Sequence, residues 1–163
     1  MINFKYPIIV VFFASILLLL GCAPQKYKNV SNEEQYRALL GTEFKSKVEL
    51  LGLGVTFDAN YNQDVDYVFI MTKPGISGPE VVFKEKLPKG VNLKLVGVLE
   101  SGRLFNNRLF YVLKFIDNEL FDEYTVIVKV FNDINNPNKG LGEDEFELIR
   151  NEAKEGSKGV GDN

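Results

Sequence analysis

The fold is decided by three apolar stretches in the second half of the chain: VNLKLVGVLE (residues 91–100), RLFYVLKFI (108–116) and EYTVIVKVF (123–131). Apolar and polar residues alternate along much of each stretch, which is the two-residue period of a strand with one buried face. The segments between the stretches are short and contain Gly, Asn or Asp, as hairpin connections do. The sequence therefore predicts an antiparallel meander in this half of the chain.

The same period appears upstream of the meander. The residues expected to face inward are Phe44, Ser46, Val48 and Leu50 in one strand, and Val65, Tyr67, Phe69 and Met71 in the next. Gly52 and Gly54 interrupt the continuation of the first strand, which predicts a bulge or a sharp bend there. Residues 73–75 (KPG) and 87–90 (LPKG) have the composition of tight turns.

A helix is expected at each end of these strands. Ser31 and Glu34 have the spacing of a capping box, and the apolar residues that follow them continue to Gly41, where the helix would stop. Residues 143–154 place Phe146 and Ile149 at helical spacing, with acidic residues in the first turn. The predicted fold is therefore mainly β: a small antiparallel barrel or strongly bent sheet with a short N-terminal helix and a C-terminal helix.

One hairpin has a local resemblance to a known fold. Residues 87–90 (LPKG) open a strand with Val91, Leu93 and Leu95, which a hairpin joins to Tyr111-Val112. This pattern resembles the central hairpin of bacterial SH3-like domains, where an aromatic pair that includes Trp precedes the final Val. This chain has Leu109-Phe110-Tyr111 at that place, and it contains no Trp.

The first residues have the pattern of an export signal. Lys5 supplies a positive charge, and an apolar run covers residues 8–20. As a helix this run would be about 20 Å long, shorter than the ~30 Å hydrocarbon core of a bilayer. A charged start, a short apolar run and a small residue at its end are typical of a secretory signal peptide, here residues 1–21.

The stretch around the end of this signal is Leu19-Leu20-Gly21-Cys22, in which the one cysteine of the chain directly follows the signal. It resembles the lipobox of bacterial lipoproteins, in which a small residue precedes the cysteine. The resemblance implies that Leu19, Leu20 and Gly21 are recognised by the signal peptidase and that Cys22 receives a diacylglyceryl group and a further acyl chain such as palmitate. The alternative is an ordinary signal peptide whose cysteine is coincidental or becomes a buried thiol.

The same resemblance implies a location. In many Gram-negative bacteria an Asp after the lipidated cysteine retains the protein in the inner membrane, and here that position is Ala23. The implied location is therefore the outer membrane, or the outer face of the cell membrane in a Gram-positive host. We expect residues 22–30 to be a lipidated tether, residues 31–155 a single β-rich domain, and residues 156–163 a disordered tail.

Composition narrows the possible partners and chemistry. The 163 residues carry 19 Lys and Arg against 22 Asp and Glu, a net charge of −3, which argues against a nucleic-acid partner. The chain has no histidine, the commonest general base and a common metal ligand, and lipidation of Cys22 would occupy its thiol. We therefore expect no cofactor, no metal site and no enzymatic activity.

Three functions remain open. The favoured one is a non-catalytic envelope lipoprotein that binds another envelope component or supports an assembly. The possible partner surface consists of apolar residues expected to face outward on the strands: Val96, Val98, Ile127 and Phe131. The alternative is that one of the helices covers them. The second is a binder of a small or lipidic ligand inside a barrel. The third, a cell-wall hydrolase, would need two facing carboxylates from a set that lies near predicted strand ends: Glu80, Glu85, Glu100 and Asp122.

Overall fold

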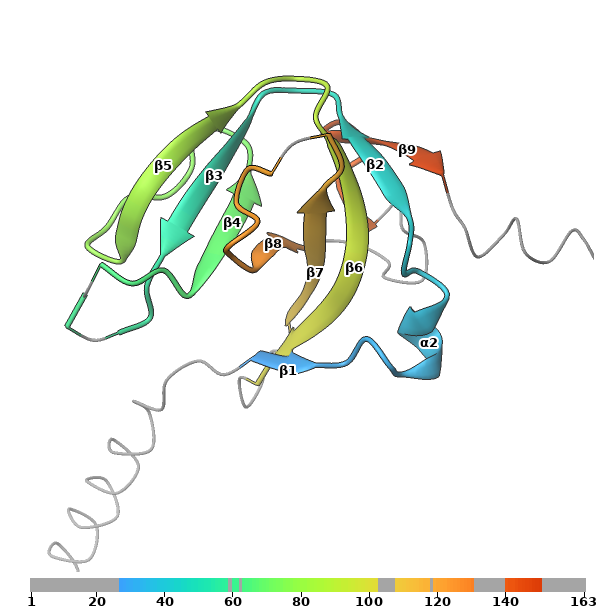
Figure 1. The fold of residues 1–163 in the computed structure, drawn as a ribbon, viewed down its shortest axis with the longest axis horizontal. Helices are drawn as coiled ribbons and strands as arrows, with labels where there is room; N and C mark the ends of the chain where they lie inside the picture. Colours follow the sequence, from blue (N-terminus) through green and yellow to red (C-terminus); the bar gives the residue numbers. More distant parts are fainter. Residues whose placement is uncertain are drawn as a thin grey trace, which may run out of the picture.

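The structure, a computed structural model, describes residues 27–58, 60–61, 63–102, 108–117, 119–130 and 140–150. This part of the chain is almost entirely strand and turn (Figure 1). The elements are β1 (Tyr27–Asn29), α2 (Glu34–Arg37), β2 (Glu43–Ser46), β3 (Leu50–Val55), β4 (Tyr67–Met71), β5 (Val81–Leu87), β6 (Asn92–Ser101), β7 (Arg108–Phe115), β8 (Val126–Lys129) and β9 (Phe146–Arg150).

All nine strands in the described residues belong to one sheet. Its order is β5-β3-β4-β8-β7-β6-β2-β9, and β1 pairs with β6 beside β2. The meander predicted for the second half is confirmed, because β6, β7 and β8 pair antiparallel in sequence order. One pair, β4 with β8, is parallel. The end strands β5 and β9 do not pair with each other, so these residues form an open sheet and the predicted closed barrel is not confirmed.

The sheet bends around one main core. Leu50 and Leu87 come from the strands at one end of the sheet, Phe44 and Phe146 come from those at the other, and all four belong to the same buried cluster. Side chains from β4, β6, β7 and β8 fill the space between them. The Thr72 hydroxyl donates a hydrogen bond of 2.8 Å to the Glu145 carboxylate, which links the end of β4 to the turn before β9. Figure 1 shows the two halves of the sheet facing one another across this core.

The opposite face of the sheet is also apolar, and this reverses one prediction. Val68 and Ile70 of β4 lie in the main core, whereas Tyr67, Phe69 and Met71 lie half-buried on the other face. The inward set predicted for this strand was therefore wrong. Strand periodicity separates two faces, but it does not say which one is inside when both are apolar.

The glycines of β3 make room for aromatic rings. A Cβ at Gly52 would lie 2.7 Å from the ring of Phe121, and one at Gly54 would lie 2.3 Å from the ring of Phe83. The pairing of β3 with β5 also shifts register between Gly54 and Val55. The predicted bulge is confirmed, and the rings show why these positions carry no side chain.

The N-terminal helix is a single turn rather than the longer helix predicted, and the predicted capping box does not form. No side chain caps α2, and its N-cap residue is Glu33. The Ser31 hydroxyl instead bonds to β6, where it accepts from the Val98 amide at 2.9 Å. A residue expected to start a helix therefore completes the hydrogen bonding of a strand.

The predicted C-terminal helix is wrong in the described residues, because Phe146–Arg150 forms the strand β9 along the free edge of β2. Phe146 and Leu148 pair with Ser46 and Phe44 in this ladder. Phe146 and Ile149 have helical spacing, whereas Phe146 and Leu148 have strand spacing. Pairing with a distant strand decides between the two structures. The expected disordered tail at residues 156–163 lies outside the described residues.

Buried serine hydroxyls accept hydrogen bonds from backbone amides at places where strands distant in sequence meet. Ser46, at the end of β2, accepts hydrogen bonds from the Gly90 and Val91 amides at 2.9 and 3.0 Å. These amides lie in the turn that leads into β6, where Gly90 has a φ of +94°. One hydroxyl thus fixes the approach of two strands that are far apart in sequence.

Candidate functional site

The residues predicted as a partner surface do not form one surface. Val96 is 46% exposed, whereas Val98 and Ile127 are each 0% exposed. Val98 belongs to the main core, and Ile127 is covered on the other face by aromatic rings. The outward assignment of Val98 was therefore wrong. Ile127 does face away from the main core, but it is covered there and not available to a partner. Phe131, the lipobox residues and Ala23 after them lie outside the described residues.

A bulge in β6 separates Val96 from Val98. Leu95 pairs with Leu113 of β7 and Gly97 pairs with Val112, so Val96 is an extra residue without a partner in that ladder. In a regular strand, positions 96 and 98 would share a face. The extra residue shifts the alternation by one, which turns Val98 inward and leaves Val96 at the surface.

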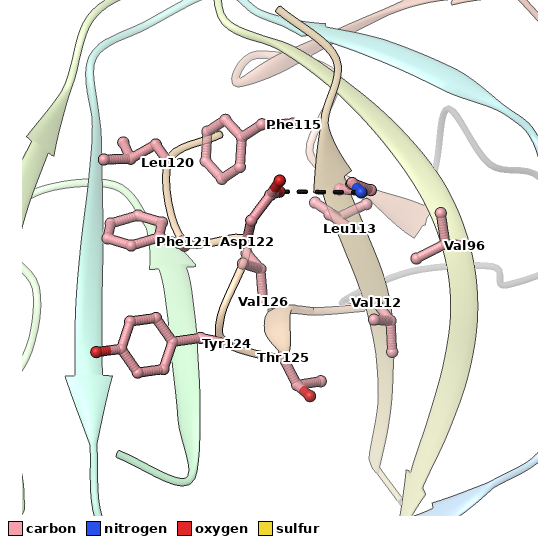
Figure 2. A pocket seen from close by; sticks show the side chains of 11 residues that line it. Val96, Val112, Leu113, Phe115, Leu120, Phe121, Asp122, Tyr124, Thr125 and Val126 are labelled. Atoms are coloured by element: carbon pink, nitrogen blue, oxygen red, sulfur yellow. Dashed lines mark ion pairs between the residues drawn. The ribbon is translucent and has the colours of Figure 1, made fainter. Parts of the chain in front are cut away.

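Val96 lies at the rim of an open cleft beside β7, which we name the β7 cleft (Figure 2). β8 pairs with β7 only from Phe110 to Leu113, although β7 continues to Phe115. The segment before β8, residues 119–125, does not pair with β7, and the cleft lies between this segment and the end of β7. Its volume is about 180 Å³.

The β7 cleft has a buried apolar floor and an exposed apolar rim. Leu113, Phe115 and Val126 form buried parts of its lining. Leu120 and Tyr124, each 37% exposed, stand on the opposite side from Val96. Three of the exposed large apolar side chains of the described residues thus lie around one opening. Scattered exposed apolar residues are common, but their convergence on a cleft marks a candidate binding site.

The wall formed by Phe121 is fixed in place. Its ring stacks on Phe83 at a centroid distance of 5.8 Å and meets Phe115 edge-on, also at 5.8 Å. The same ring rests over Gly52. Phe121 has a φ of +65°, which is rare for a bulky residue and is held by the contacts around it. Phe121 therefore gives the β7 cleft one wall that the surrounding packing holds in place.

One ion pair crosses the β7 cleft. The Lys114 Nζ of β7 lies 4.0 Å from the Asp122 Oδ1, and the two side chains are 62% and 39% exposed. Figure 2 shows Asp122 reaching from the 119–125 segment toward β7. An exposed pair at this distance adds little stability, and both groups keep hydrogen-bonding capacity for a ligand.

The candidate carboxylates are not assembled in this cleft. Asp122 is the single carboxylate among its lining residues, and it faces Lys114 rather than another acid. Glu85 lies on β5 and Glu100 on β6, with four strands between them in the sheet. Within the described residues, no group of three or more His, Cys, Asp or Glu side chains could hold a metal ion. No helix of those residues is long and apolar enough to span a bilayer.

A second apolar feature lies where the described chain begins. The ring of Tyr27 packs edge-on against Tyr67 at 4.9 Å and Phe110 at 5.1 Å, and it also contacts Phe57. Burial, followed by the charge of Asp66, raises the pKa of Tyr67. Tyr27–Asn29 pairs with β6, so the segment expected as a tether is folded from Tyr27 onward.

No protein-family model, curated protein or solved structure matches this chain significantly. The sequence predicts Val96 but not the residues opposite it, because the stretches 108–116 and 123–131 have the pattern of two strands joined by a hairpin connection. In the structure β8 starts only at Val126. The available signal was Leu120-Phe121, two large apolar residues inside an otherwise acidic connection.

Proposed function

We propose that this chain is a lipid-anchored protein of the bacterial cell envelope whose non-catalytic β-domain binds another envelope protein through the β7 cleft. The anchor rests on the lipobox resemblance of residues 19–22, with Cys22 as the lipid carrier and the outer membrane as the location implied by Ala23. The observation that supports binding is the convergence of Val96, Leu120 and Tyr124 on one opening.

The short connection between anchor and domain supports this function. Cys22 and Tyr27 are five residues apart, and a fully extended chain of that length spans at most about 18 Å. A domain on such a tether stays beside the membrane surface. Two or three acyl chains hold firmly at ~0.8 kcal/mol per buried methylene, whereas one myristoyl-length chain is marginal. The domain would therefore meet partners in or near the same membrane.

The alternatives have less support. A lipidic ligand in the interior needs an apolar chamber, and pockets for drug-sized ligands measure about 300–1,000 Å³. The β7 cleft is about 180 Å³ and opens at the surface, while side chains fill the space within the bend of the sheet. A glycoside hydrolase needs two carboxylates about 5–10 Å apart across its groove. The cleft lining offers one.

Photocrosslinking in whole cells tests the partner surface. A photoreactive residue at position 96 should give a discrete crosslinked product, whereas one at position 76 should not. Ile76 is a matched control because it is 44% exposed and does not line the cleft. Leu120→Asp should abolish the product at position 96. Equal products at both positions, or a product that persists with Leu120→Asp, would remove the β7 cleft as the binding surface.

A further inference from the structure

The size of the β7 cleft limits what can enter it. An apolar protein cavity of about 150 Å³ accepts one benzene molecule. At about 180 Å³, the cleft therefore fits a single phenylalanine- or leucine-sized side chain rather than a lipid tail or a large cofactor. Such a pocket for one anchoring side chain is typical of the energetic centre of a protein interface.

The polar groups of the cleft match the backbone N–H and C=O of one extended residue. The Lys114 ammonium offers up to three N–H donors, and the Asp122 carboxylate is an acceptor. They lie 4.0 Å apart across the same opening. A residue in an extended segment directs its own N–H and its own C=O to the same side, so it can donate to Asp122 and accept from Lys114 while a large apolar side chain enters the apolar part.

We infer that the β7 cleft is a peptide-recognition site that takes one large apolar side chain from an extended segment of the partner, with Lys114 and Asp122 bonded to the backbone C=O and N–H of one residue of that segment. This inference rests on the proposed function, because it specifies the kind of segment that the same cleft would bind. The charges at the opening cancel, so the segment next to the anchor side chain is uncharged.

The geometry favours a peptide over a lipid. A lipid tail carries no hydrogen-bonding groups beside its methylenes, so it would form no bonds with Lys114 and Asp122, whose side chains are 62% and 39% exposed at the opening. The fixed ring of Phe121 forms one wall of the cleft, and the bulged Val96 closes the side opposite Leu120. A side chain entering between them would contact apolar groups on both sides.

A titration of the mature chain carrying Cys22→Ser tests this inference without the anchor or the natural partner. The probes are N-acetyl-phenylalanine methylamide, N-acetyl-alanine methylamide and toluene, and the readout is amide and methyl NMR shifts. We expect the phenylalanine probe to shift the resonances of Leu113 and Val126 and to bind at least tenfold more tightly than the alanine probe. Toluene should bind at least fivefold more weakly, because it cannot bond to Lys114 and Asp122.

Exposed-residue variants sharpen the test because they leave the core intact. Val96→Asp should weaken the phenylalanine probe at least fivefold, whereas Ile76→Asp should change its affinity less than twofold. Lys114→Met combined with Asp122→Asn should make the probe and toluene bind alike. No shifts in the cleft, or toluene binding as tightly as the peptide probe to the unmodified cleft, would overturn the inference. So would a shift of the same resonances by phosphatidylglycerol vesicles without any by the peptide probe.

Each outcome can be separated from the proposed function. If the peptide probe fails while crosslinking at position 96 persists in cells, the cleft binds a partner through other chemistry. If the probe binds but Cys22 carries no lipid, the recognition site stands and the anchored function falls.

Discussion

Replacement of Ile127 by alanine tests whether this residue is buried, as the structure shows, or lies on an exposed partner surface, as the sequence predicted. Ile127 is 0% exposed and lies beneath Phe69, Phe110 and other side chains on the second face of the sheet. The rings of Phe69 and Phe110 meet edge-on at 6.0 Å, so they are poorly placed to collapse into a cavity. Val96 was predicted to share this surface, but it is 46% exposed.

The magnitude follows from the atoms removed. Ile127→Ala deletes three carbons, which cost about 0.8 kcal/mol each in transfer free energy, or about 2.4 kcal/mol. An unfilled cavity of roughly 50 Å³ adds about 1 kcal/mol at ~24 cal/mol per Å³. The free energy of unfolding should therefore fall by about 3.5 kcal/mol, and Tm by roughly 10–15 °C for a domain of this size. Val96→Ala should cost less than about 0.5 kcal/mol.

Urea unfolding followed by circular dichroism measures both variants, and the slope against urea shows whether the unfolded state has changed. The chain has no Trp, so tyrosine fluorescence is the second probe. If Ile127→Ala and Val96→Ala were equally mild, β8 would be open on one side and the described packing would be incorrect.

Three further predictions concern two contacts between strands and one ion pair at the surface. Gly54→Ala forces a Cβ against the Phe83 ring and should lower the free energy of unfolding by about 1–3 kcal/mol. Phe83→Leu in the same chain should recover more than half of that loss. If urea unfolding shows that the effects of the two substitutions simply add, Gly54 and Phe83 are not in contact. Ser46→Ala leaves the buried Val91 amide without its acceptor and should lower the free energy of unfolding by about 1–3 kcal/mol, whereas the exposed Ser77→Ala should change it by less than about 0.5 kcal/mol; equal effects would argue against this role for Ser46. The hydrogen bond and charge of Lys73 lower the pKa of Glu49, so any stability from this pair is present above the unfolded pKa of Glu49 and is lost as the pH falls through the folded value. An NMR titration should show the Glu49 pKa rising in Lys73→Met, and an unchanged value would rule out the pair in solution.

The sequence predicted the elements whose signals are local. The β6–β7–β8 meander follows from alternation and short turns, and the Gly52–Gly54 irregularity follows from residues that leave space for rings. The strands of the meander and the glycines of β3 can be recognised in a window of ten residues, whereas the rings that fill the space over these glycines belong to the distant Phe121 and Phe83.

The sequence predictions fail where contacts between residues far apart in sequence determine the structure. The phase of alternation in β6 changes at the bulge between Leu95 and Gly97, and a single glycine was the local hint of it. Phe146 and Ile149 fit a helix until the free edge of β2 is known. The β7 cleft could not be predicted because it forms where β8 stops short of the end of β7, and that mismatch depends on how β8 also pairs with β4.

The acyl state of Cys22 tests the anchored function most directly. Intact mass spectrometry of the protein purified from membranes, after growth with labelled palmitate, should show a chain beginning at Cys22 with diacylglyceryl and acyl groups attached. Cys22→Ser should carry no label and leave the membrane fraction. A wild-type chain without lipid, or a Cys22→Ser variant that keeps both label and membrane association, would contradict the account.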